Sequence, residues 1–304
     1  MSQNFPPVRL VALDLDGTLL NHSGEITPLT REAIARATAN GVVVVPATGR
    51  PLASLPPVVA KQPWVHYALT SNGAAVWDLG GDPLGCVYSR YANAAEHETS
   101  QPECIVRRCF PVEKAREVFG LYQEFEGSLS VFSDGMVIRD HLAQERMGER
   151  QRRLLSLSTE AKQPNDGRFH IVRDTAEWMS RHAHEIEKFC MFFENAEAAE
   201  AALPRFYALE GVEVVQGSPD NIEVTAKGVD KGSALLALAD RLGIPHECTL
   251  AVGDSDNDRA MLEKAGVAAV MANGMERVKQ LADIVSENDC DHDGVAEIFA
   301  RLSV

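Results

Sequence analysis

Two aspartates near the N-terminus are the first residues whose spacing indicates chemistry. Asp14 and Asp16 directly follow Val8–Leu13, which is apolar and rich in Val and Leu, as a buried parallel strand is. Since alternate side chains of an extended chain point the same way, both carboxylates can converge on one small volume. Such close like charges repel unless a cation or a shared proton offsets them. Gly17 then permits a sharp turn and lets backbone N–H groups approach an anion. We therefore predict a functional site here rather than a simple Asp-Gly turn.

A second group of acids follows another short apolar strand, predicted at Leu250–Gly253. The loop after it contains Asp254, Asp256, Asn257 and Asp258. An acid before a helix can simply cap it, but one cap explains only one acid. Together with the first pair, the loop makes a set of oxygen ligands, which is the composition that Mg²⁺ prefers alongside waters and substrate phosphate. The sequence therefore predicts a Mg²⁺ site.

Other metal chemistry has little support in the sequence. His182 and His184 lie on a polar stretch, and we expect them at the surface rather than on zinc. The six cysteines form no C-x-x-C pair and show no zinc spacing. They are expected to be reduced and mostly buried thiols.

Two further polar residues are placed to meet the same sheet edge. Thr48 follows the predicted strand Val42–Val45, and parallel strands end at a common edge, so its hydroxyl would arrive near Asp14 and donate to a phosphate oxygen. Thr48 could instead cap the next segment. Lys231 opens a predicted helix, where a cation is unfavourable to the helix dipole. It is thus a candidate to offset charge on a transferring phosphoryl group, the alternative being a solvated helix start.

These residues together suggest phosphoryl transfer. A carboxylate at a strand end, facing a phosphoryl group, can attack it and form an aspartyl-phosphate. The second acid of the first pair is then free to protonate the leaving oxygen and later to take a proton from water.

The composition is that of a soluble globular protein of about two domains. The chain has 304 residues, of which 45% are hydrophobic and 24% charged. Acids outnumber Lys and Arg by 44 to 29, for a formal net charge of -15. This excess argues against nucleic acid or an anionic membrane as a partner, since both need basic patches. The N-terminus lacks a signal-peptide pattern, and no run approaches the roughly 18 apolar residues of a membrane helix. We therefore expect a cytoplasmic protein, and nothing in the sequence indicates its oligomeric state.

The pattern of predicted elements changes in the middle of the chain. Apolar strands alternate with helices at both ends, whereas the centre has short strands and hairpins, one turned by Asp134-Gly135, flanked by helices. A helix in this central part is predicted to be interrupted at Pro204. We therefore predict an α/β fold, with a doubly wound parallel sheet from residues 1–83 and 226–304. Residues 84–225 are predicted to form an inserted α+β domain.

Four short motifs occur in the order DLDGT, ATGR, KG and GDSDND. They resemble the four motifs of the haloacid dehalogenase (HAD) superfamily of phosphohydrolases. The large insert between the second and third motifs is similar to the Cof-type, class IIB branch, as are the stretches SNGA and DHDGVA. The resemblance implies a HAD-like Rossmannoid core and an α+β cap that selects the substrate. MANG at 271–274 departs from the more usual Gly-Asn-Ala order, which leaves the role of Asn273 open.

The resemblance also implies roles for the first two motifs. Asp14 would be the nucleophile and a ligand of Mg²⁺. Asp16 would be the acid/base, and its backbone carbonyl would bind the metal. Thr48 and Lys231 would hold the phosphoryl group, together with Gly17.

For the last motif, the resemblance implies that Asp254 binds Mg²⁺ directly. Asn257 and Asp258 would organise the metal's waters and the phosphate.

The reading favoured by these residues is a Mg²⁺-dependent phosphatase of small phosphorylated metabolites, such as sugar phosphates or pyridoxal-phosphate-like compounds. A phosphomutase and a non-catalytic phosphometabolite-binding protein are the alternatives. Asn72, which precedes a glycine and fits a hairpin turn that faces the site, and Asn221, before the last strand of the insert, are candidate substrate contacts. Four basic residues of the insert either meet an anionic group or lie on a solvated face, the latter being favoured for each: Arg107, Arg108, Arg139 and Lys188.

Overall fold

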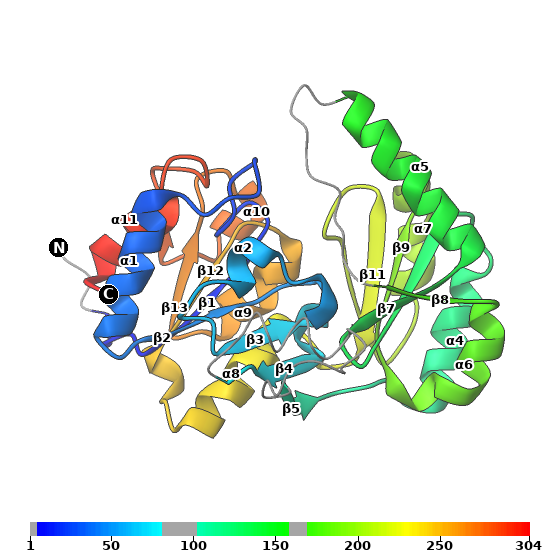
Figure 1. Cartoon of the computed structure of the whole chain (residues 1–304), viewed down its shortest axis with the longest axis horizontal. Helices are drawn as coiled ribbons and strands as arrows, with labels where there is room; N and C mark the ends of the chain where they lie inside the picture. Colours follow the sequence, from blue (N-terminus) through cyan, green and yellow to red (C-terminus); the bar gives the residue numbers. More distant parts are fainter. Residues whose placement is uncertain (1–4, 81–101, 158–168) are drawn as a thin grey trace, which may run out of the picture.

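The computed structural model describes residues 5–80, 102–157 and 169–304. Figure 1 shows one group of strands and helices around the two chain ends and a second group, from the middle of the chain, beside it. Five parallel strands form the central sheet of the first group, in the order β14-β13-β12-β1-β2. They are β1 (Leu10–Leu13), β2 (Val43–Pro46), β12 (Thr249–Gly253), β13 (Val267–Val270) and β14 (Ile284–Val285).

Both faces of this sheet are covered by helices, which confirms the doubly wound α/β core. Val11 and Leu13 face one hydrophobic cluster, with α1 (Pro28–Ala39) and α11 (Gly294–Leu302). Leu10 and Ala12, one position along, face the other cluster. The helices of this second cluster are α8 (Lys231–Leu242) and α9 (Arg259–Lys264). The core also contains the short helices α2 (Pro57–Ala60) and α10 (Glu276–Lys279). Because alternate residues of one strand enter two cores, the strand is apolar throughout.

A small antiparallel sheet continues from the open edge of β2. It contains β3 (Tyr67–Thr70), β4 (Ala75–Asp78) and β5 (Glu103–Arg107), and a bridge from Ala47 to Leu69 joins it to the central sheet. The turn Ser71–Gly73 connects β3 to β4, so the predicted Asn-Gly hairpin is confirmed. β5 pairs with β4, although it lies inside the range predicted for the insert. Residue 84 itself lies outside the described residues, and the boundaries at 83 and 225 stay predictions.

The second group is built on a six-stranded sheet in the order β10-β11-β9-β6-β7-β8. The turn of the β6–β7 hairpin is Asp134-Gly135, as predicted, with both residues at positive φ. Its strands are β6 (Ser128–Ser133), β7 (Met136–Asp140), β8 (Phe169–Val172), β9 (Ile186–Phe192), β10 (Val212–Val215) and β11 (Asn221–Ala226). Its helices are α4 (Val112–Tyr122), α5 (His141–Leu157), α6 (Thr175–His182) and α7 (Ala196–Tyr207). Strands and helices mix here in the α+β manner predicted for a cap.

Most of the hydrophobic packing of the cap lies on one face of its sheet, and only a small cluster lies on the other. Phe189 and Ile222 from the sheet share a cluster with Tyr122 of α4 and Phe206 of α7. The predicted interruption at Pro204 is wrong: α7 runs through it to Tyr207. Proline removes only one helical N–H bond, and the packing of Phe206 holds the last turn against the sheet.

Within residues 5–80, 102–157 and 169–304, no helix has both the length and the apolar composition required to span a bilayer.

The hairpin turn Ser71–Gly73 generates a prediction about packing. Gly73 has φ +90, and a Cβ there would lie 2.2 Å from the carbonyl oxygen of Asp230, just before α8. Gly41 has a similar φ of +85 but no atom within 4 Å of a built Cβ. We expect Gly41→Ala to cost about 1–2 kcal/mol through its φ alone. Gly73→Ala should cost at least about 2 kcal/mol more, because backbone must shift. Urea unfolding of both variants measures the difference, and equal losses would contradict the proposed contact.

Candidate active site

The candidate site lies at the carboxyl edge of the central sheet, where β1 and β12 end side by side. Leu13 pairs with Val252, and the N–H of Asp14 donates to the carbonyl of Val252 at 3.0 Å. This register brings Asp14 next to the loop that follows β12. One carboxylate oxygen each from Asp14, Asp254 and Asp258 lies within 4.8 Å of the others. The predicted gathering of the two acidic motifs is thus present, and we call these residues the acid group.

Lys231 is the cation inside the acid group. Its Nζ donates to Oδ1 of Asp14 at 2.5 Å and to Oδ1 of Asp258 at 2.7 Å, and its side chain is fully buried. The alternative of a solvated helix start is therefore wrong. Asp230 caps α8 by accepting from the N–H of Ser233, so the helix begins with its N-terminal lysine turned inward.

Burial and mutual repulsion raise the pKa values of the acids. The pKa of Asp14 is well above 3.8, chiefly because the carboxyl is desolvated and then because Asp258 is close, although Lys231 opposes both effects. Burial alone would lower the pKa of Lys231, but its ion pairs with Asp14 and Asp258 outweigh this and raise it. The lysine therefore stays charged, and the acids compete for it.

Asp254 and Asp258 have different surroundings. Both oxygens of Asp258 are engaged, since Oδ1 accepts from Lys231 and Oδ2 accepts from the N–H groups of Asp254 and Ser255. Asp254 receives a hydrogen bond from Thr18 Oγ1 to Oδ1 at 3.1 Å. Desolvation and the neighbouring Asp258 raise the pKa of Asp254 to about 7. Asp258 therefore organises the loop, while Asp254 keeps an oxygen for another partner.

The acid group fits a divalent cation. Three carboxylates against one ammonium leave an excess of two negative charges when all are ionised. Among the described residues, no donor is recorded for Oδ2 of Asp14 or of Asp254. Hard oxygen ligands of this kind suit Mg²⁺. Gly17, at φ +87, leaves space beside Asp254, since a Cβ there would lie 2.8 Å from Oδ2 of Asp254.

Asp16 lies apart from the acid group, so the predicted convergence of the first two carboxylates differs from the structure. Its side chain is 62% exposed, and Arg50 donates to Oδ1 at 2.7 Å and to Oδ2 from Nε at 3.1 Å. The bidentate pair turns the carboxylate toward solvent. Sequence reasoning assigned no role to Arg50, although it stands directly after Thr48-Gly49 in the ATGR motif.

Thr48 follows β2, the strand beside β1, and Asn257 directly precedes Asp258; both side chains are held by local hydrogen bonds. Thr48 is 2% exposed, and its Oγ1 accepts from the N–H of Arg50 at 3.1 Å. The following short helix, Leu52–Ser54, begins after Pro51, so Thr48 is not its N-cap. Asn257 accepts from Ser255 Oγ at 2.9 Å. The hydroxyl hydrogen of Thr48 remains available to an incoming oxygen.

The cap meets the core through buried charged residues that sequence reasoning missed. Oε2 of Glu223 accepts from Asn72 of the core hairpin at 2.6 Å and from Lys188 at 2.9 Å. Lys188 also donates to the carbonyl of Gly49 at 2.5 Å and is 1% exposed, so the expectation of a solvated face is wrong for it. A glutamate inside the apolar strand NIEVTA was the signal available in the sequence.

A second contact of the same kind lies beside the first. Ser71 Oγ donates to Glu187 at 2.9 Å, and Glu187 is fully buried. Desolvation raises the pKa of Glu187, and the hydrogen bond from Ser71 opposes that rise. Asn221 lies on the cap side, where its amide donates to Oε1 of Glu223 at 3.2 Å and its carbonyl accepts from the N–H groups of Gly217 and Ser218. Both predicted substrate contacts, Asn72 and Asn221, therefore share one glutamate.

Two of the other three predicted basic residues, Arg107 and Arg139, have partners of their own. Arg107 pairs with Asp134 and lies 3.7 Å from Glu187, whereas Arg139 donates to Ser130 at 2.7 Å. Arg108 is half-buried.

The predicted surface and thiol residues are placed as follows. The side chains of His182 and His184 are 38% and 63% exposed, as expected for surface residues. Cys86 lies outside the described residues. None of the five described cysteines forms a disulfide, and most of them are buried: Cys104, Cys109, Cys190, Cys248 and Cys290. Asn273 donates to the carbonyl of Gly17 at 2.8 Å and accepts from the N–H of Cys290, which gives it a structural role.

Comparison with known proteins places these features in a family. The profile of the family described as haloacid dehalogenase-like hydrolase matches residues 11–85 and 92–299. Phosphatase YwpJ of Bacillus subtilis (strain 168) is 30% identical over 303 residues, with 97% of this chain and 100% of the relative covered. The 5-amino-6-(5-phospho-D-ribitylamino)uracil phosphatase YcsE of the same organism is 26% identical, with 95% and 94% covered. The solved HAD subclass IIB sugar phosphatase BT4131 has a similar fold, with a TM-score of 0.72 at 21% identity over 97% of this chain and 99% of that chain.

The raised pKa of Asp254 predicts how stability depends on pH. Its value is raised from 3.8 to about 7, so the folded protein binds this proton more tightly than the unfolded chain does. The stabilisation is complete below about pH 4 and is lost as the pH rises through about 7. In a metal chelator, the free energy of unfolding should therefore fall between about pH 4 and pH 8, and less steeply in Asp254→Asn. Urea titrations test this, and equal slopes in both proteins would show that Asp254 is not responsible.

Proposed function

The chain belongs to the haloacid dehalogenase-like hydrolases, and on that premise we propose that it is a Mg²⁺-dependent phosphatase of small phosphorylated metabolites. The supporting observation is the acid group, in which Asp14 stands at the end of β1 with Lys231 on one oxygen and no recorded donor, among the described residues, on the other. A carboxylate held by one oxygen presents the second to an electrophile. We assign the nucleophile to Asp14.

The proposed reaction has two steps. An oxygen of Asp14 attacks phosphorus, the bond from phosphorus to the substrate oxygen breaks, and Asp16 gives that oxygen a proton. Water then attacks the aspartyl-phosphate, Asp16 takes a proton from it, and the bond to Asp14 breaks to release phosphate. When bound, Mg²⁺ held by Asp14, Asp254 and the carbonyl of Asp16 supplies the charge that offsets the phosphoryl oxygens.

Lys231, Thr48 and Gly17 hold the phosphoryl group in this scheme. Lys231 already bridges Asp14 and Asp258, so its charge lies beside the attacking oxygen. Asn257 and Asp258 shape the loop around the metal's waters. These residues contribute to catalysis by electrostatic stabilisation. Because they are already in place before substrate arrives, they need not reorganise during the reaction.

Asp16 has to leave Arg50 before it can act as an acid. The guanidinium holds the carboxylate in a two-point hydrogen-bonded pair that is turned outward. A substrate phosphate competes for the guanidinium, which frees Asp16 to take up a proton and turn toward the leaving oxygen. Arg50 is thus assigned as the residue that holds Asp16 away from the acid group between turnovers.

The cap supports the proposed substrate class. The face of the cap sheet near the core carries Lys188, Glu223 and Asn221, a set suited to hydroxyl and amide groups. Oδ1 of Asn72 is a buried oxygen that no described residue satisfies, so it can accept from a substrate hydroxyl. The relative YcsE acts, by its name, on a phosphoribityl compound. We propose phosphorylated, hydroxyl-rich metabolites of the cytoplasm as substrates, with sugar phosphates and pyridoxal-phosphate-like compounds as the first to assay.

Replacing the nucleophile tests the mechanism. We expect Asp14→Asn to lower phosphate release from para-nitrophenyl phosphate by at least about 10³-fold, because the amide cannot attack phosphorus at a useful rate. Asp240→Asn is the matched control, since Asp240 is exposed and pairs only with His246 among the described residues. Full activity in Asp14→Asn would refute the assignment, and phosphate appearing on a second sugar instead of in solution would indicate a phosphomutase.

Metal removal tests the cofactor. Activity should be abolished by EDTA and restored by Mg²⁺, because the excess negative charge of the acid group repels a phosphate until a cation is bound. The acid group should also be more stable with the ion, so Mg²⁺ should raise the thermal midpoint of the wild type and not that of Asp254→Asn. Turnover that persists in EDTA after dialysis would remove the metal from the mechanism.

A further inference from the structure

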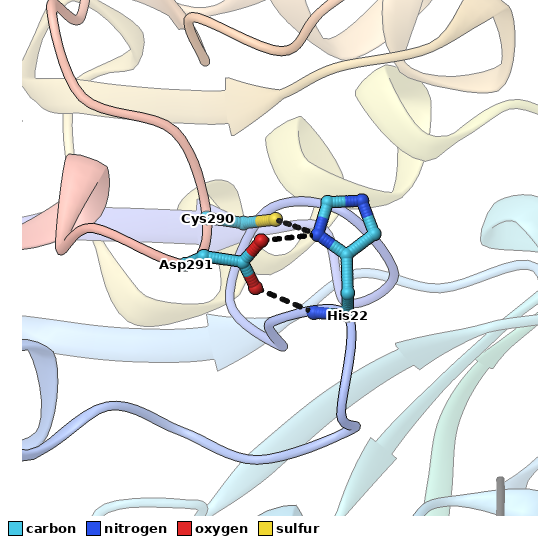
Figure 2. Close-up of side chains that lie close together, drawn as sticks. All are labelled: His22, Cys290 and Asp291. Carbon is cyan, nitrogen blue, oxygen red and sulfur yellow. Dashed lines mark hydrogen bonds and ion pairs between the residues drawn. The ribbon is translucent and has the colours of Figure 1, made fainter. Parts of the chain in front are cut away.

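A second group of metal-ligating side chains lies outside the acid group. His22, in the loop after the DLDGT motif, faces Cys290 and Asp291 in the loop before α11, 268 and 269 positions away (Figure 2). One ligand atom from each of the three residues lies within 4.8 Å of the others. We call them the His-Cys-Asp group. They differ from the acid group by containing a nitrogen and a sulfur.

Both contacts of the histidine converge on the same ring nitrogen. Nδ1 lies 2.5 Å from Oδ2 of Asp291 and 3.7 Å from Sγ of Cys290, as the dashed lines in Figure 2 show. One ring nitrogen offers either one proton or one lone pair, so it cannot serve both neighbours with hydrogen bonds at once. A single cation between the three atoms satisfies all of them together.

This arrangement is not that of a nucleophilic thiol. In a catalytic triad the histidine uses one nitrogen for the nucleophile and the other for the carboxylate, whereas here both partners meet Nδ1. The arrangement therefore points to coordination rather than to covalent chemistry.

The distances suit a tetrahedral transition-metal ion. Ligands about 2.0–2.3 Å from zinc at tetrahedral angles are roughly 3.3–3.6 Å from one another, close to the 3.7 Å between Nδ1 and Sγ. The 2.5 Å between Nδ1 and the carboxylate would have to lengthen by under about 1 Å, which an exposed side chain allows, since His22 is 64% exposed. Mg²⁺ does not take thiolate or imidazole in preference to oxygen. The open side at His22 provides an entry path and a fourth position for water.

The geometry points to a binding site for one Zn²⁺-type transition-metal ion on Nδ1 of His22, Sγ of Cys290 and a carboxylate oxygen of Asp291, separate from the acid group. Binding replaces the S–H bond of Cys290 by a sulfur–metal bond and releases the proton to solvent. The ion ties the loop after the first motif to the loop before α11. Cys290 also donates its N–H to Asn273, whose amide holds the carbonyl of Gly17, so the bound ion braces the loop that carries Asp16.

Cobalt absorption tests the site without relying on activity. Co²⁺ is added to the full-length protein in excess Mg²⁺, and we expect a thiolate-to-cobalt charge-transfer band at one equivalent, which carboxylate ligands alone cannot give. Cys290→Ser should abolish the band, and His22→Gln should weaken cobalt binding by at least about tenfold. The matched controls Cys248→Ser and His246→Gln, whose residues lie in the short helix before β12, should keep it.

A stability measurement distinguishes binding from misfolding. Zn²⁺ should raise the thermal midpoint of wild type and of the two controls, and have less effect on His22→Gln, whose side chain is 64% exposed. Absence of the band in wild type at saturating Co²⁺, or its survival in Cys290→Ser, would overturn the site. Because no readout is turnover, these results are independent of the phosphatase proposal.

Discussion

The structure depends on one buried ammonium group shared between carboxylates from distant parts of the chain. Lys231 is fully buried and donates to Asp14 and to Asp258. Removing one partner from such a network leaves an uncompensated buried charge, which is strongly unfavourable. The ends of β1, β12 and α8 are therefore fixed relative to one another by electrostatics as well as by the apolar strands behind them. The acid group has one ammonium for three carboxylates. This excess of negative charge suits the site to a metal ion, and with the ion to a phosphate.

The cap is joined to the core by the same kind of interaction. Glu223 accepts from Asn72 of the core and from Lys188 of the cap, and Lys188 reaches the carbonyl of Gly49 beside Thr48. Buried charges of this type contribute specificity of arrangement more than net stability. They place the polar face of the cap sheet above the loop of the second motif, which is where a substrate group attached to the phosphate would lie.

The sequence was sufficient for features that arise from local patterns. The apolar runs before Asp14 and Asp254 identify parallel strands, whose carboxyl ends share an edge, so the meeting of Asp14 with the loop after Gly253 was predicted correctly, whereas the convergence of Asp14 with Asp16 was not. The predictions that were wrong concern contacts between residues that are distant in the sequence. Arg50 forms an ion pair with Asp16, and Lys188 is buried because it pairs with the buried Glu223. The glutamate inside NIEVTA signals a buried charge but does not identify its partner, and a lone lysine in a strand is indistinguishable from a surface lysine until its partner is known. The predicted helix interruption at Pro204 was wrong for a similar reason. The packing of Phe206 in the core of the cap outweighs the loss of one backbone hydrogen bond.

The close packing at Gly73 links the hairpin turn Ser71–Gly73 to the start of α8. A Cβ at this position would meet the carbonyl of Asp230 and lie 3.0 Å from the backbone nitrogen of Lys231. The neighbouring Asn72 touches the cap. Asn72, which contacts the cap, and Lys231, which donates to Asp14, are thus connected through the tightly packed backbone at Gly73. A side chain at position 73 would therefore displace the backbone that leads into Lys231 and, through the neighbouring Asn72, the contact with the cap.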